Sequence, residues 1–184
     1  MKKFFLIFAL AFLLCGCQKT GPEYLVSGIG FDSKDGKYNV CFETIIINTE
    51  NTAQTVRLLK GEGDTVKNAV RQINAQCTQP LLMAHCGVVV IGEDITYNQL
   101  KEVGDYCFNE DEITLSAYFV RTDNAEKLFS LKPISSASVG YDVMGLVKRN
   151  KRFNNRFFEV VNSDYKATVP RISIKDKGIK FDEQ

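Results

Sequence analysis

The stretch EYLVSGIGFDSKDGKYNVCFETIIIN, residues 23–48, decides the fold, because it is typical of two β-strands joined by a tight turn. Asp35-Gly36 is a pair favoured in hairpin turns, since both residues tolerate the backbone angles of the turn. Along the second strand the side chains alternate with the period of a half-buried strand: Tyr38, Val40 and Phe42 against Asn39, Cys41 and Glu43. We therefore predict an antiparallel hairpin, followed by a third extended segment at residues 53–63.

Residues 63–77 predict a helix, because apolar residues recur there at the spacing of one helix face: Val66, Ala69, Val70 and Ile73. Asp64 or Thr65 is suited to cap its start. Further patterns predict strands at residues 85–94, 112–122 and 167–176, and helices at 96–108, at 124–131, from Ser138 and at 155–164. The order predicts an α+β fold: a mixed, mainly antiparallel β-sheet with helices packed on it, as a single domain over residues 23–184.

The first 16 residues have the pattern of a secretory signal peptide. Met1-Lys2-Lys3 is basic, and the apolar run from Phe4 to Leu14 is shorter than the ~20 residues that a spanning helix needs. The run ends in Leu14-Cys15-Gly16-Cys17, which resembles the lipobox of bacterial lipoproteins. The alternatives are an ordinary secreted protein and an uncleaved signal anchor.

The lipobox assigns a covalent acyl lipid to Cys17. Cleavage before Cys17 would remove residues 1–16, and diacylglycerol on the thiol would hold the chain on the outer face of a membrane. Two acyl chains give a stable anchor where one gives a marginal one. Residues 17–22 then form the lipidated cysteine and a short tether, and Cys15 leaves with the signal peptide.

Composition and charge exclude some partners. The formal net charge of +1 gives no reason to expect a polyanionic ligand. The basic run from Lys148 to Arg156 could bind nucleic acid in a cytoplasmic chain, but an exported protein meets none. It is suited to a solvated helix end, to anionic lipid headgroups or to an acidic partner. Glu110-Asp111-Glu112 is typical of a solvated loop.

Four further cysteines, Cys41, Cys77, Cys86 and Cys107, permit two disulfides in an exported chain. Unpaired, buried thiols are the preferred interpretation, since a chain of this length does not need covalent staples. No Cys-x-x-Cys motif occurs, and the one histidine, His85, has only a single cysteine beside it. We therefore predict no metal site.

His85 is also the first candidate for catalysis, as a base for Cys86 or Cys107. No nucleophile-elbow motif accompanies it, so a structural histidine at the entrance of a buried strand is the preferred interpretation. The glycine pairs Gly28/Gly30 and Gly61/Gly63 lack the rest of a phosphate-binding motif and are interpreted as turn and bulge glycines. Asp32 to Gly36 resembles a calcium loop only faintly and is interpreted as a hairpin turn.

Several stretches in order resemble the spore germination lipoproteins, the GerAC-like family that forms the C subunit of nutrient germinant receptors. LVSGIGFDSKDGKYNV resembles the first strand and hairpin of that family. Gly63, Thr65 and Ala69 resemble its helix start, and ATVPRISI, residues 167–174, its closing strand. The most specific piece is LLMAHCGVVVIGEDI, which matches at Ala84, His85, Ile91, Gly92 and Glu93.

The resemblance implies a non-enzymatic, lipid-anchored protein of the spore inner membrane that assembles with the integral-membrane receptor subunits A and B. It implies no cofactor besides the lipid on Cys17. The chain departs from the family at Gln18-Lys19, where Trp-Asp is usual, and at Asn109 to Glu112, where Arg-Asp-Pro-Glu is usual. The C-terminal domain usual in the family is expected to be absent. A lipid-tethered envelope protein without receptor partners and an exported cysteine enzyme remain the alternatives.

Overall fold

The computed structural model describes residues 22–48, 54–109, 113, 116–150, 156–166, 169–175 and 178–182, and it begins with the expected hairpin. Strands β1 (Glu23–Lys34) and β2 (Lys37–Ile47) pair antiparallel around Asp35 and Gly36. Both turn residues have positive φ, 53° and 79°, as a tight hairpin turn requires. Strand β3 (Gln54–Gly63) pairs antiparallel with the other side of β2. All three predicted strands are therefore confirmed.

The second half of the sheet is parallel. Strand β5 (Val88–Gly92) pairs with β1, and β6 (Tyr118–Thr122) pairs with β5, which gives the order β3-β2-β1-β5-β6. The two-residue strand β4 (Leu81–Leu82) lies beside the start of β1. A separate hairpin of β7 (Ile172–Lys175) and β8 (Gly178–Phe181) follows. The predicted mixed sheet with helices packed on it is confirmed.

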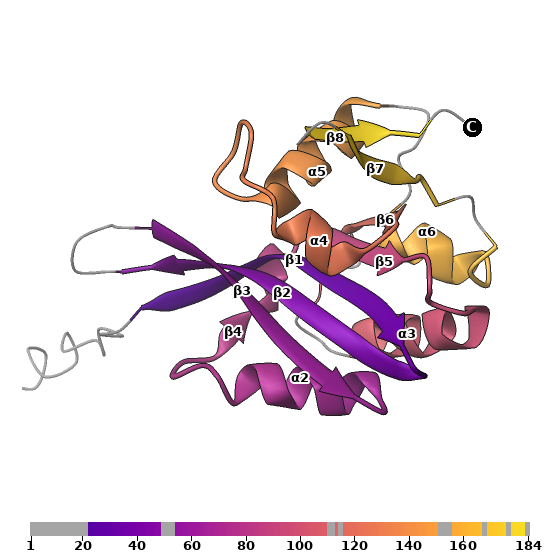
Figure 1. Ribbon diagram of the computed structural model, residues 1–184, viewed down its shortest axis with the longest axis horizontal. Helices are drawn as coiled ribbons and strands as arrows, with labels where there is room; N and C mark the ends of the chain where they lie inside the picture. The colour runs from indigo at the N-terminus through magenta and orange to yellow at the C-terminus, as the bar shows by residue number, and fades with distance from the viewer. Residues whose placement is uncertain are drawn as a thin grey trace, which may run out of the picture.

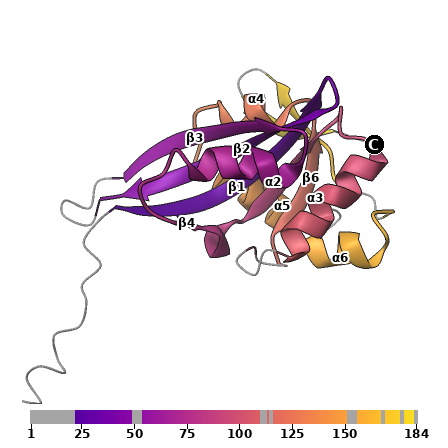
Figure 2. The same ribbon diagram turned by 90° about the horizontal axis from the view of Figure 1, so that it is seen from below.

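Helices cover both faces of the sheet, as Figures 1 and 2 show. One face carries α2 (Val66–Asn74), α3 (Tyr97–Asn109) and α6 (Phe157–Asn162). The other face carries α4 (Ala125–Phe129), α5 (Val139–Arg149) and the β7–β8 hairpin. A short 3-10 helix, η1 (Met83–His85), precedes β5. The two layers of helices create two hydrophobic cores with the sheet between them.

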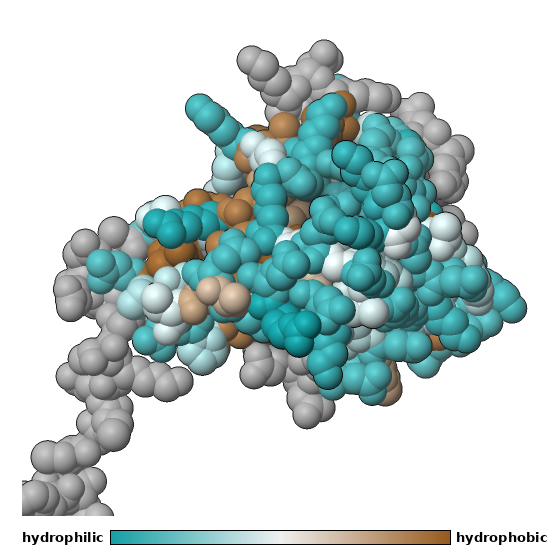
Figure 3. Space-filling view, turned by 60° about the horizontal axis from the view of Figure 1, so that its bottom comes forward, coloured by the Kyte–Doolittle hydropathy of each residue, from teal (hydrophilic) through white to brown (hydrophobic). Residues whose placement is uncertain are grey.

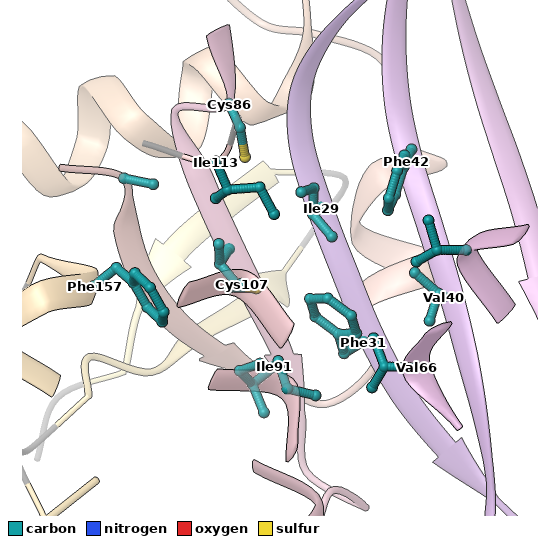
Figure 4. Packing of buried hydrophobic residues seen from close by; sticks show 14 of the residues in the cluster. Ile29, Phe31, Val40, Phe42, Val66, Cys86, Ile91, Cys107, Ile113 and Phe157 are labelled. Carbon is teal, nitrogen blue, oxygen red and sulfur yellow. The ribbon is translucent and has the colours of Figure 1, made fainter. Parts of the chain in front are cut away.

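The larger core lies between the sheet and α2, α3 and α6. In Figure 4, Ile29 and Phe31 of β1 and Phe42 of β2 point into this layer, with Cys107 of α3 beside them. Phe119 of β6 stacks with Phe157 of α6 at 5.7 Å between ring centroids. The smaller core joins alternate residues of the same strands to α4 and α5. Because side chains alternate along a strand, β2, β5 and β6 each contribute residues to both cores.

Helix starts follow from local side chains. Thr65, one of the two predicted caps, accepts a hydrogen bond from Asn68 N at the start of α2. Asn124 and Ser138 do the same for α4 and α5, so the helix predicted from Ser138 is confirmed. Sequence patterns therefore place these helix starts within a residue.

Three expectations need correction. Strand β2 is not half-buried along its middle, because α4 and α5 cover the second face and leave Cys41 and Glu43 at most 2% exposed. The strand predicted at residues 112–122 begins only at Tyr118. Strands β4 and β8 have no counterpart among the predictions, because two to four residues are too few to show a periodic pattern.

Glycines 61 and 63 were interpreted as turn or bulge residues, but they lie inside β3, where α2 crosses the strand. A Cβ on Gly61 would come within 2.1 Å of the Ala69 carbonyl oxygen. A Cβ on Gly63 would lie 2.7 Å from Ala69 N. Backbone cannot move aside as a side chain can, so these glycines let helix and strand approach each other. Gly28 does adjoin a β-bulge, which follows Val26.

We expect Gly61→Ala to lower the free energy of unfolding by roughly 1–3 kcal/mol, the usual cost of overpacking. Gly145 of α5 is the matched control, because a Cβ there meets nothing within 4 Å. Gly145→Ala should raise stability by about 0.5–1 kcal/mol, since alanine favours a helix interior. Thermal and urea unfolding of the purified variants measure both changes. Equal stability of the two variants would contradict the close packing of α2 on β3.

Candidate functional site

Two buried carboxylates on the hairpin bind the helices of the smaller core. Asp32, near the end of β1, accepts hydrogen bonds from Ala125 N at 2.8 Å and Glu126 N at 3.0 Å, the first residues of α4. A carboxylate at this position compensates the partial positive charge of a helix N-terminus. Burial raises the pKa of Asp32, whereas these two amide bonds oppose the rise.

Glu43 of β2 plays the same part for α5. Its carboxylate accepts hydrogen bonds from Val139 N at 2.7 Å and Gly140 N at 2.6 Å, and from the Ser27 hydroxyl at 2.7 Å. The side chain is almost completely buried. Burial raises the pKa of Glu43, and the bonds from Ser27, Gly140 and Val139 oppose that rise. Each oxygen is satisfied by a donor from the fold, so neither is offered to a ligand.

A cluster around Arg171 holds the β7–β8 hairpin against the parallel half of the sheet. Its guanidinium forms ion pairs with Glu93 after β5, Asp123 after β6 and Asp182 after β8, the last with 2.8 Å between Nε and Oδ2. Arg121 N donates to the carbonyl of Pro170 at 2.8 Å. The edge of β6 is therefore covered by the residues that precede β7.

The Asp32 carboxylate and the Arg171 cluster explain why glycine and glutamate occupy positions 92 and 93. Glu93 pairs with Arg171, and a Cβ on Gly92 would come within 2.1 Å of Asp32 Oδ1. Glycine at position 92 therefore leaves the space that the Asp32 carboxylate occupies on its way to α4. Sequence reasoning recognised the motif but not this purpose, because Arg171 and Asp32 are far from it in the chain.

The candidate pair of His85 and a neighbouring thiol is not assembled. His85 is exposed at the end of η1, whereas Cys86 and Cys107 are buried in the larger core. The Cys86 thiol donates to the carbonyl of Val88 at 3.3 Å, and burial raises its pKa to about 12. A thiol at that pKa is a poor nucleophile near neutral pH. The geometry therefore gives no support to a cysteine enzyme.

None of the four cysteines within the described residues takes part in a disulfide. Cys41, Cys86 and Cys107 are buried, and Cys77 is partly exposed. Burial raises the pKa of the Cys41 thiol strongly, with the carboxylates of Asp32 and Glu126 adding to the rise. The preferred prediction of unpaired thiols is confirmed, with Cys77 less buried than expected.

The remaining candidate residues divide between described and undescribed parts of the chain. Lys148 and Arg149 are exposed at the end of α5, as expected for a solvated helix end. Arg156 differs, because its guanidinium lies 3.9 Å from the centroid of the Tyr118 ring and donates to the Ser116 carbonyl. Cys17, the acidic run at residues 110–112 and the basic residues at 151 and 152 lie outside the described residues.

A depression of about 430 Å³ beside the end of α2 is open to solvent. Its lining includes Cys77, Pro80 and Tyr106 and contains no Asp, Glu, Lys, Arg or His. A second depression, of about 560 Å³, lies at the hairpin turn and is lined by Lys34, Asp35 and Asp94, among others. Within the described residues, no group of three or more His, Cys, Asp or Glu side chains is placed to hold a metal ion.

The most distinctive surface is an apolar face at the outer end of the antiparallel strands, on the side of α5. Register places Leu25, Ile45 and Val56 in one row across β1, β2 and β3. Ile47 and Leu58 lie on the same side, one pleat outward and one pleat inward. Val56 is 41% exposed. Leu25, Ile47 and Leu58 are partly exposed, whereas Ile45 is buried, at 3% exposed. We call Leu25, Ile47, Val56 and Leu58 the apolar end face, which sequence reasoning did not predict because it depends on cross-strand register.

Comparison with known proteins identifies one family. The family described as "Spore germination protein N-terminal domain" matches residues 23–174. The match therefore spans both halves of the sheet and extends into β7. No curated protein and no solved structure matches the chain. Within the described residues, none of the helices has the length and apolarity needed to cross a bilayer.

Glu43→Gln should flatten the pH dependence of stability. A pKa raised by folding means that the folded protein holds the proton more tightly than the unfolded chain. The contribution of Glu43 to the free energy of unfolding is therefore greatest below its ordinary pKa of 4.5 and falls as pH rises through the folded-state pKa. Urea unfolding from pH 4 to neutral measures this slope, and the variant should lose part of it. Exposed Glu23→Gln is the control, and an unchanged slope in Glu43→Gln would contradict the expectation.

Arg171→Met should loosen the β7–β8 hairpin without unfolding the sheet. The change removes three ion pairs and leaves Glu93, Asp123 and Asp182 facing one another, which repels the hairpin. Hydrogen exchange followed by mass spectrometry should show faster exchange at residues 172–181 and unchanged protection in β1 and β2. Arg57→Met, at an exposed residue of β3, is the control. Uniform exchange changes across the whole domain would argue against a local role.

Proposed function

Because the chain belongs to the spore germination family whose N-terminal domain it matches, we propose that it is a lipid-anchored, non-enzymatic component of a nutrient germinant receptor. The single observation that carries this proposal is the family match over residues 23–174. Its place would be the outer face of the spore inner membrane. Its partners would be the integral-membrane receptor subunits A and B, which it would contact through its protein surface.

The chemistry of the domain supports a binding role. The buried carboxylates Asp32 and Glu43 are occupied by helix N-termini, and Arg171 is occupied by three acids. Cys86 is buried with a raised pKa. These two carboxylates and this guanidinium are thus used to hold the fold together. What the domain offers to other molecules is its shape and its exposed side chains.

The anchor is supported by the sequence before the domain. The basic start, the short apolar run and Leu14-Cys15-Gly16-Cys17 fall in the order of a lipoprotein signal. Diacylglycerol on Cys17, with a further acyl chain, would hold the domain stably at a bilayer. Five residues separate Cys17 from Glu23, the first residue of β1. The domain would therefore lie directly against the membrane that holds its partners.

Cys17→Ala in spores should move the protein from the membrane fraction to the soluble fraction and abolish most of its contribution to nutrient-triggered germination. The physical reason is the loss of the acyl chains. Cys15→Ala is the matched control, since Cys15 precedes the expected cleavage site and leaves with the signal peptide. Immunoblots of spore fractions and the loss of optical density after nutrient addition measure the two effects.

Two outcomes would contradict the proposal in different ways. Membrane retention and nutrient response that are unchanged in Cys17→Ala would exclude the lipid anchor. Normal anchoring together with an unchanged nutrient response in a strain lacking the gene would exclude the receptor role. That second result would favour an envelope protein without receptor partners.

A further inference from the structure

The apolar end face lies at the same end of the domain as the start of β1. Glu23 begins β1, and Leu25, two residues later, is the first member of the face. Val56 lies two strands away in the same row, a distance of roughly 10 Å at the usual strand spacing. In Figure 3, apolar surface gathers at the left-hand end of the domain, where the antiparallel strands project in Figure 1.

The loop between α4 and α5 contributes a further exposed apolar residue near the apolar end face. It rises beside the outer end of the sheet in Figure 1 and carries Ile134, which is 63% exposed. Asp142 of α5 fixes the loop, because its carboxylate accepts hydrogen bonds from Ile134 N at 2.5 Å and from the Ser135 hydroxyl at 2.8 Å. Ile134 is thus held in a solvent-exposed position by the hydrogen bonds between the loop and Asp142.

The two faces of the strands differ at this end. On the opposite side from the apolar end face, the row beginning at Tyr24 continues to Ile46 and Thr55, and the Tyr24 hydroxyl bonds to Thr78 at 3.3 Å. Arg57, two residues after Thr55, is exposed on that same opposite side, and Glu23, two residues before Leu25, is an exposed acid on the side of the apolar end face. Exposed Lys132 lies on the loop with Ile134. Exposed apolar residues gathered on one side of an element are the pattern of surfaces that insert into a membrane interface.

The short tether between Cys17 and Glu23 favours the lipid bilayer as the binding partner of the apolar end face. The six residue-to-residue steps from Cys17 to Glu23 span at most about 20 Å when fully extended. A lipid on Cys17 would therefore keep the start of β1, and the face beside it, within that distance of the bilayer surface. A protein partner could reach any side of the domain, but the bilayer is confined to this end.

We propose that the apolar end face and Ile134 dip into the interface of the lipid bilayer that holds Cys17, and so fix the orientation of the domain on the membrane. This inference rests on the proposed lipid anchor. The lipid-anchored domain then has one preferred orientation on the membrane. In that orientation the β6 edge and α6 point away from the bilayer. Membrane-embedded subunits would then meet a defined side of the domain.

The chain contains no tryptophan, so a single introduced tryptophan reports on one position. Val56→Trp and Ile134→Trp test the face, and Phe158→Trp is the control, because Phe158 is 44% exposed on α6. Each lipidated full-length variant is reconstituted into vesicles of phosphatidylethanolamine and phosphatidylglycerol with brominated acyl chains. We expect bromolipid to quench roughly half of the emission at 56 and 134 and to leave emission at 158 nearly unchanged, because an interfacial face lies ~5–10 Å deep.

Flotation of the same vesicles separates this inference from the proposed anchor. Protein that floats with the vesicles but shows no quenching at 56 and 134 would overturn the inference and leave the anchor intact. Protein that does not float would overturn both. A blue shift at 56 that grows with protein concentration without quenching would assign the face to a second copy and would also overturn the inference. Thermal unfolding of all three variants confirms that the domain is folded.

Discussion

The architecture depends on two carboxylates that are buried in an otherwise apolar layer. Asp32 and Glu43 sit on neighbouring strands of one hairpin, and each receives two backbone amides from the start of a helix. Burying a carboxylate without hydrogen-bond partners costs a large amount of folding free energy. The hairpin can therefore be buried on this side only if the N-termini of α4 and α5 point at the two carboxylates. The rest of the smaller core follows from that constraint.

The same requirement explains why small residues surround the carboxylates. Gly92 leaves space for Asp32, and a Cβ on Gly140 would come within 2.8 Å of Glu43 Oε2. On the opposite face, Gly61 lets α2 lie against β3. Polar anchoring sets the direction of the helices on one side, and close backbone contact sets it on the other. The sheet is thereby fixed between two layers by different physical means.

Sequence reasoning reached the parts of the fold that are local. The Asp35-Gly36 turn, the cap at Thr65 and the helix after Ser138 are all encoded within a few neighbouring residues, and all are confirmed. It did not reach Glu43, whose partners are 96 and 97 residues away. It also did not predict the ion pairs of Arg171 or the apolar end face. Both depend on contacts between separate strands, which produce no periodic pattern in the sequence. The family match came from short motifs whose structural purpose only the fold reveals.

The division of the sheet into an antiparallel and a parallel half has a consequence for the order in which the chain folds. Residues 23–74, which contain β1, β2, β3 and α2, form a contiguous unit that can pair before the rest of the domain is made. Its second face still carries Glu43 and Asp32 without their helix partners at that moment, because the amides that bind them belong to residues 125–140. Completion of the domain therefore coincides with neutralising these two sites, and a chain interrupted before α5 would expose charged, half-covered strands to quality-control proteases.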